Sequence, residues 1–142
     1  MFRQTTRCWQ FLLQASVRVI LSKYGITGGV LVVDDSEKKR TKQTTRIYQA
    51  HQVKDHKSGG FMNGQHVVFL LLVTGQVTIP VGVELYMPDP QRTAWKKEEP
   101  RLKKQGMCKK NRPAKPRKNP NYPTIPESAL RVLKAFRTAF PE

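Results

Sequence analysis

Two adjacent aspartates, Asp34 and Asp35, follow the apolar run "GVLVV" and precede the strongly basic stretch "SEKKRTKQTTR". Carboxylates held at the end of a strand could bind a hard divalent cation, which prefers oxygen ligands, while the following lysines and arginines could hold a polyanion beside it. The structural alternative is a turn after the strand, in which an aspartate accepts hydrogen bonds from backbone amides. The choice between the two depends on the rest of the chain.

The charge of the chain narrows the class of partner. Its 142 residues include 26 Lys and Arg against 10 Asp and Glu, which gives a formal net charge of +16. A small protein with this excess repels itself unless a polyanion offsets the charge. Nucleic acid is therefore the leading candidate partner, with an acidic membrane surface as the second.

The cysteines and histidines do not indicate a zinc site or a disulfide framework. Cys8 and Cys108 lie far apart, and neither belongs to a Cys-x-x-Cys pair, so the pattern favours a reducing, intracellular setting. His51, His56 and His66 follow one another at spacings of five and ten residues, which match no zinc pattern. We expect these histidines to be solvated, near phosphate.

Hydrophobic spacing predicts an α/β fold. Apolar side chains recur every three or four residues over residues 8–24, which predicts a helix that is too short and too polar to span a bilayer. Residues 29–35 have the β-branched composition of a strand, and two apolar runs joined by a Thr-Gly-Gln break predict a hairpin of strands 66–74 and 77–87. A final helix is expected over residues 126–139, packed on one face of this three-stranded sheet.

The composition changes abruptly in residues 91–121, which we call the basic arm. This segment contains twelve Lys or Arg and only two acidic residues, Glu98 and Glu99. Prolines at positions 100, 113, 116 and 120 lack the backbone N–H that a helix uses, so no continuous helix is expected across the arm. The prediction is a mobile arm with one or two helical turns around residues 95–104, whose excess of cations favours phosphate contact over a merely solvated face.

Several stretches of the chain together resemble a known family. "VVDDSEKKRTK" and, after it, "HQVKDHKSGG", "NGQHVVFLLLVTG", "IPVGVELYMPDP" and "AWKKEEPRLKKQG" are similar to the first catalytic block and following hairpin of insertion-sequence transposases with a DDE triad, in the large family named for insertion sequence four. The resemblance covers roughly residues 22–142. It implies a ribonuclease H-like fold, here incomplete, with three strands including an antiparallel hairpin, flanking helices and the basic, proline-rich arm.

The resemblance also implies a domain organisation and a catalytic role. Residues 1–25 would be a helix left from a preceding region, and residues 26–142 the N-terminal part of the catalytic domain. In the family the first triad aspartate usually precedes Ser or Thr, which carries the catalytic and metal-binding role onto Asp35, with Asp34 as the alternative. The cofactor would be Mg²⁺, two ions of which activate the attacking oxygen and stabilise the leaving oxygen.

The family's second aspartate and its glutamate would both come after the end of this sequence, so whether the chain is an enzyme is left open. Glu84, on the third expected strand, could contact a metal or could be a polar residue beneath a covering element. The chain is then either a catalytically incomplete member of a family that cuts and rejoins DNA strands, or a small basic nucleic-acid-binding protein whose aspartates are structural.

The partner that the resemblance implies is DNA at the ends of a mobile element, with no membrane contact, and the full-length family could form a homodimer. The implied location is a prokaryotic cytoplasm, on the nucleoid when the protein is bound to DNA. Contacts to phosphate position a protein without reading bases, so little sequence specificity is expected. The residues expected to contact DNA are Lys38, Lys39, Arg40, Lys42, Arg92, Lys96, Lys97, Arg101, Lys103, Lys104, Lys109, Lys110, Arg112, Lys115, Arg117 and Lys118.

Overall fold

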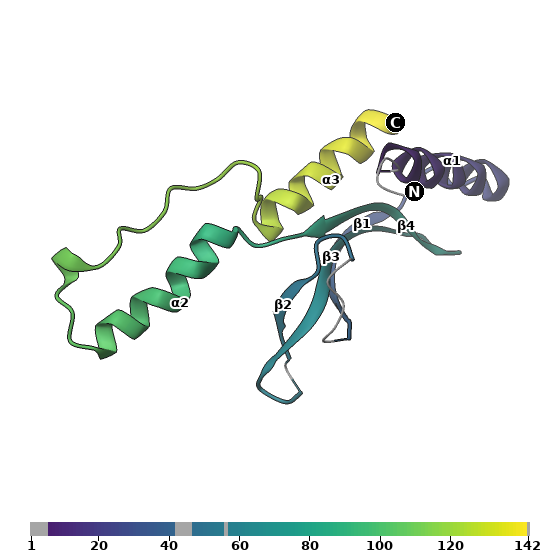
Figure 1. The fold of residues 1–142 in the computed structure, drawn as a ribbon. Coiled ribbons are helices and arrows are strands. Elements are labelled where there is room, and N and C mark those ends of the chain that lie inside the picture. Colours follow the sequence, from purple (N-terminus) through teal and green to yellow (C-terminus); the bar gives the residue numbers. More distant parts are fainter. Residues whose placement is uncertain (1–5, 42–46, 56, 142) are drawn as a thin grey trace.

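A computed structural model describes residues 6–41, 47–55 and 57–141, which form a mixed α/β structure with three α-helices and a four-stranded antiparallel sheet (Figure 1). The elements are α1 (Thr6–Tyr24), β1 (Val30–Lys39), β2 (His51–Lys54), β3 (Phe61–Val73), β4 (Thr78–Tyr86), α2 (Pro90–Lys104), a 3-10 turn (Lys109–Asn111) and α3 (Ile125–Ala139). The expected α/β class is confirmed, but the sheet has one strand more than predicted. The additional strand, β2, has only four residues, HQVK, which lack the apolar pattern of a strand.

The long strand β3 is the centre of the sheet. Gly64 pairs with both Lys39 of β1 and His51 of β2, and the residues from His66 to Val73 pair with both β1 and β4. Because a strand has only two edges, β1 occupies one edge of β3, while β2 and β4 share the other edge end to end. The predicted β3–β4 hairpin is confirmed. Among the described residues, the outer edge of β1 pairs with no strand.

α1 and α3 lie against one face of this sheet (Figure 1). Leu70 and Leu72 occupy alternate positions of β3, hence one face, and are buried in a cluster with Val17 of α1 and Val132 of α3. We call this the helix-covered face and the opposite one the second face. The predicted packing of the C-terminal helix on one face of the sheet is confirmed.

α1 matches the helix predicted over residues 8–24. Leu13, Val17 and Ile20 pack into the core, whereas Trp9 and Tyr24, at the two ends of the predicted apolar face, are exposed. None of the described helices is both long enough and apolar enough to cross a bilayer.

The close approach of α3 to β4 depends on Gly82. A Cβ atom at this position would lie 2.2 Å from Cγ1 of Val132, so a side chain larger than hydrogen does not fit. α3 begins after Thr124, whose backbone N–H and hydroxyl each donate to Oε2 of Glu127 at 2.9 Å. Hydrogen bonds from Lys118 and then Thr124 lower the pKa of Glu127 from its ordinary value of 4.5 to about 2.

The prediction of only one or two helical turns in the basic arm is wrong, because Pro90–Lys104 form one continuous helix. Asp89 caps its first turn by accepting a hydrogen bond from the backbone N–H of Gln91 at 2.9 Å, and Pro90 lies where its missing N–H has no helical partner to lose. Pro100 lies inside the helix and removes one backbone hydrogen bond. At the other end the backbone N–H of Gln105 donates to the Arg101 carbonyl at 3.1 Å, so α2 is closed at both ends.

β1 is longer than the strand predicted over residues 29–35. It continues to Lys39, so Asp34 and Asp35 lie in the middle of a strand and not in a turn after it. The change to polar residues does not end the strand because its pairing with β3 continues as far as Gly64.

Candidate nucleic-acid interface

Asp34 and Asp35 point to opposite faces of β1. Asp34 pairs with Phe69 and Asp35 with Val68, and successive residues of a strand alternate between faces. Asp35 therefore lies on the helix-covered face, and Asp34 on the second face, where its Oδ1 accepts a hydrogen bond from the Asp35 backbone N–H at 2.9 Å. The two carboxylates cannot act as two ligands of one ion.

Asp35 contacts a buried histidine. Its Oδ2 lies 2.7 Å from Nε2 of His66, whose other ring nitrogen lies 3.7 Å from Oε1 of Glu37. His66 is only 8% exposed, and its ring meets that of Tyr86 edge to face, with centroids 5.4 Å apart. The expectation that His66 is solvated is therefore wrong, because its pairing opposite Glu37 puts it on the helix-covered face. Since both ring nitrogens face carboxylates, the imidazole holds Asp35 in place.

Glu84 lies in the same row of the sheet as Asp35. Both residues pair with Val68, from its two edges, so their Cα atoms are about 10 Å apart, which is two strand spacings. The Glu84 carboxylate accepts a hydrogen bond from Oγ of Ser128 at 3.3 Å and lies 3.6 Å from the guanidinium of Arg131. Of the two interpretations of Glu84, this geometry supports the polar residue beneath a covering element, which is α3.

The residues around Asp35 do not fit a magnesium site. Mg²⁺ needs near-octahedral oxygen ligands at about 2.1 Å, whereas Asp35 faces an imidazole, a ligand that suits other divalent metals, and Glu84 is held by α3. Residues 6–41, 47–55 and 57–141 contain no group of three or more His, Cys, Asp or Glu side chains that could hold a metal ion. No catalytic step through Mg²⁺ follows from this arrangement.

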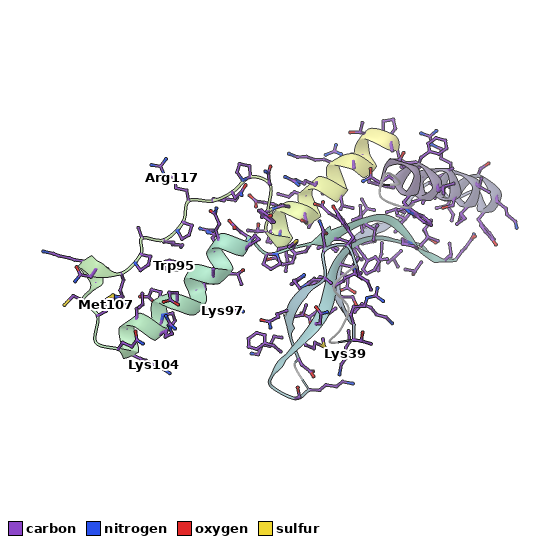
Figure 2. All side chains as sticks on the ribbon, in the orientation of Figure 1. Lys39, Trp95, Lys97, Lys104, Met107 and Arg117 are labelled. Carbon is purple, nitrogen blue, oxygen red and sulfur yellow. The ribbon has the colours of Figure 1, made fainter. Side chains whose placement is uncertain are left out.

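The basic arm folds back on itself. The indole N–H of Trp95 donates to the carbonyl of Pro113 at 2.9 Å, and the Arg112 guanidinium lies 2.5 Å from the Glu99 carboxylate. Figure 2 shows Trp95 between α2 and the chain that returns beside it, and Lys104 at the end of α2 farthest from the sheet. We call residues 90–113 the α2 hairpin. This part of the arm, predicted to be mobile, has contacts of its own.

Most of the twelve cations of the arm are available to a ligand. Four have partners: Lys97 donates to Gln52 at 2.9 Å, Arg101 to Glu98 at 2.8 Å, and Arg112 and Lys118 pair with Glu99 and Glu127. The other eight make no ion pair or side-chain hydrogen bond with any described residue, and all except the half-buried Arg92 are exposed. They are Arg92, Lys96, Lys103, Lys104, Lys109, Lys110, Lys115 and Arg117.

The cations that follow Asp35 and are predicted to contact DNA differ in whether the fold leaves them available to a ligand. Lys38 and Lys39 are exposed at the end of β1 (Figure 2 labels Lys39), on opposite faces of the sheet. Arg40 donates from Nε and from one terminal nitrogen to Oε1 of the buried Gln65, at 2.9 and 2.6 Å, so its guanidinium is committed to the sheet. Lys42 lies outside the described residues.

Sequence reasoning missed Phe61, which follows a tight turn between β2 and β3. Asp55 organises this turn, because its carboxylate accepts hydrogen bonds from the Ser58 hydroxyl at 2.7 Å and the Lys57 backbone N–H at 3.0 Å. These hydrogen bonds lower the pKa of Asp55, that from Ser58 the most. Phe61 pairs with Lys54 across the hairpin. The signal in the sequence is an aromatic residue directly after "KSGG", with one lysine before the turn, Lys54, and one within it, Lys57.

Comparison with known proteins assigns the chain to no family. No protein-family model, curated protein or solved structure matches it. Its function must therefore be argued from the residues and geometry described above.

Proposed function

We propose that this protein binds the phosphate backbone of DNA through the α2 hairpin and the chain that follows it, and that it is related to the insertion-sequence DDE transposases. The observation that carries the proposal is the set of eight cations of the basic arm without a partner among the described residues.

The physical basis is electrostatic. Each phosphate that a lysine or arginine neutralises releases condensed counterions, which favours binding at moderate salt. α2 buries no side chain, so DNA can cover it without disturbing the core. Lys96 and Lys103 are seven positions apart and therefore lie on one side of α2, as a row facing outward. The aromatic residue of this hairpin, Trp95, is committed to Pro113, so the α2 hairpin contacts the backbone and not the bases.

The relationship to transposases is supported by topology as well as by sequence resemblance. β1, β3 and β4 form an antiparallel meander, and the first strand holds Asp35 on the helix-covered face. This arrangement is the one expected for the opening of a ribonuclease H-like fold, and DNA at mobile-element ends is the corresponding partner. Mg²⁺ remains part of the proposal only as the family's cofactor, because the described residues do not form a site for it.

Strand cleavage by this chain is not proposed. Two-metal phosphoryl transfer needs several carboxylates converging on ions about 4 Å apart, and Asp35 is engaged with His66. We expect no nicking or joining of DNA with Mg²⁺ or Mn²⁺, and little change in DNA affinity in Asp35→Ala. Metal-dependent cleavage that is lost in Asp35→Ala would overturn this expectation.

The second candidate is a small basic nucleic-acid-binding protein without catalytic ancestry. The Asp35–His66 contact favours it, because a carboxylate that fixes a buried imidazole has a sufficient structural role. Both candidates predict the same binding surface.

The test of DNA binding is a fluorescence-anisotropy titration with two unrelated duplexes of about 20 base pairs, at about 50 and 200 mM salt. We expect affinity to fall at least about tenfold between the two salt concentrations and to differ little between the duplexes. Affinity that is insensitive to salt, or that depends strongly on one sequence, would contradict the proposal. A variant with the eight unpartnered cations changed to Gln should lose most of the binding.

A further inference from the structure

Phe61 is the most exposed large apolar side chain of the described residues, with 75% of its surface accessible. It is the first residue of β3, and hence sits on a regular strand. Leaving a phenylalanine in water forgoes the stabilisation that its burial would supply. An aromatic ring held out in this way is available to a ligand.

Several hydrogen bonds form in the turn that precedes Phe61. The Asp55 backbone N–H donates to the Gly60 carbonyl at 2.8 Å, the Gly59 N–H donates to the Asp55 carbonyl at 2.9 Å, and the Asp55 carboxylate holds Ser58 and Lys57. Gly59 has a φ of +72°, which a glycine adopts without strain. These hydrogen bonds shape the backbone that leads into Phe61.

Lysines from three elements lie on or reach the second face of the sheet, the face that carries Phe61. Lys54 of β2 pairs directly with Phe61, and cross-strand partners share a face. Lys38 of β1 pairs with Gln65, which lies four residues after Phe61 on β3 and therefore on the same face of the sheet. From α2, Lys97 reaches Gln52, the residue of β2 opposite Asn63. Lys38, Lys54 and Lys97 are all exposed.

We propose that Phe61 is a stacking platform for an unpaired base of single-stranded DNA, with Lys38 and Lys54 holding the phosphates beside it. This inference rests on the proposed DNA binding and adds a substrate class to it. An aromatic ring flanked by cations binds single strands because every base offers a π-face and every linkage a charge. In a duplex the base faces are already stacked on one another, so Phe61 adds nothing to duplex binding.

Phe11 supplies a matched control. It is exposed to a similar degree, 70%, and lies on α1, away from the tip of the β2–β3 hairpin (Figure 1). Arg18, one cation on its helix, is engaged with α3, because it donates to the Ala139 carbonyl at 3.3 Å and its guanidinium lies 5.6 Å from the centroid of the Phe140 ring. The same Phe→Ala substitution can therefore be compared inside and outside the proposed platform.

The experiment measures the affinity of the full chain for labelled oligothymidylate of about 20 nucleotides and for a duplex of the same length. Phe61→Ala should weaken single-strand binding about tenfold, since one base–aromatic stack contributes about 1–3 kcal/mol. Duplex binding should stay within about twofold, Phe61→Trp should retain single-strand binding, and Phe11→Ala should change neither. Lys54→Gln should weaken single-strand binding.

The outcomes separate this inference from the proposed function. If Phe61→Ala leaves single-strand affinity unchanged, or weakens single-strand and duplex binding equally, the platform is wrong while DNA binding stands. If the wild-type chain binds neither DNA, the proposed function fails and the platform with it. Because Phe61 is exposed, circular dichroism and the thermal midpoint of Phe61→Ala should match the wild type, which excludes misfolding as the cause of a loss.

Discussion

α2 and α3 are helices of equal length, fifteen residues each, that are held in different ways. α3 buries Ser128 and Val132 and rests directly on Gly82 of β4. α2 buries no side chain; it is held by the Asp89 cap and by the fold-back through Trp95. The difference shows that polar contacts can order a helix outside the core, which leaves its cations free for a ligand. Changes in α3 should therefore alter the stability of the whole domain, and changes in α2 should alter local order and DNA affinity.

The largest effect is expected at the contact between α3 and β4. Gly82→Val should lower the free energy of unfolding by about 3 kcal/mol, because the new side chain must displace Val132 from the core. Urea denaturation followed by circular dichroism measures this loss. Gly28→Val is the control, since no atom lies within 4 Å of a Cβ built there. Equal stability of the two variants would show that α3 does not pack on β4 as described.

A substitution inside α2 should act in the opposite sense and only locally. Pro100→Ala restores the backbone N–H and removes the ring clash, so α2 should open less readily, by up to about 3 kcal/mol. Amide hydrogen exchange should show slower exchange in α2, with the free energy of global unfolding unchanged. A rise in global stability of similar size would mean that α2 belongs to the cooperative core after all.

The charges of the two helices should differ in their effect on DNA. Lys96→Gln with Lys103→Gln on α2 should weaken duplex binding about tenfold and reduce the slope of log affinity against log salt by about 1.8. Lys134→Gln with Arg137→Gln, both exposed on α3, should change these quantities much less. Anisotropy titrations over a range of salt concentrations measure both. An equal loss in the two double variants would indicate a diffuse charge effect without a binding surface.

The smallest effect concerns acid stability at the start of α3. The folded-state pKa of Glu127, about 2, lies below its ordinary value of 4.5. Its ionised carboxylate therefore contributes stability that is fully present above pH 4.5 and is lost as the pH falls toward 2. Glu127→Gln should make the free energy of unfolding depend less on pH in this interval. Parallel pH profiles for wild type and Glu127→Gln would contradict the hydrogen bonds that Glu127 accepts from Lys118 and Thr124.

Sequence patterns predicted the elements that enter the core. The helical spacing of Val17 and its neighbours, and the alternation along β3, both report a buried face directly. The full length of α2 escaped prediction because its order comes from pairs 13 and 18 residues apart, Arg112 with Glu99 and Trp95 with Pro113, which no local pattern reveals. Pro100, inside α2, lacks a backbone N–H, and a prediction from local sequence alone therefore counts it against a helix.

The candidate site was predictable to a similar extent. Strand alternation alone places Asp34 and Asp35 on opposite faces. The contact of Asp35 with His66 links residues 31 positions apart, so it requires the register of β1 against β3. Residue type predicts that Arg40 and Arg112 could meet phosphate, but only the fold shows that Gln65 and Glu99 already hold them.

The outer edge of β1 has a consequence for the behaviour of the protein in solution. Unpaired along the described residues and lined by the exposed Val30, it offers N–H and C=O groups with which another chain can pair. A net charge of +16 keeps molecules apart and so protects this edge. Salt or DNA screens the charge but leaves the edge as it is. Molecules gathered on one DNA by the proposed binding would lose their mutual repulsion where their concentration is highest, which would favour pairing between their β1 edges.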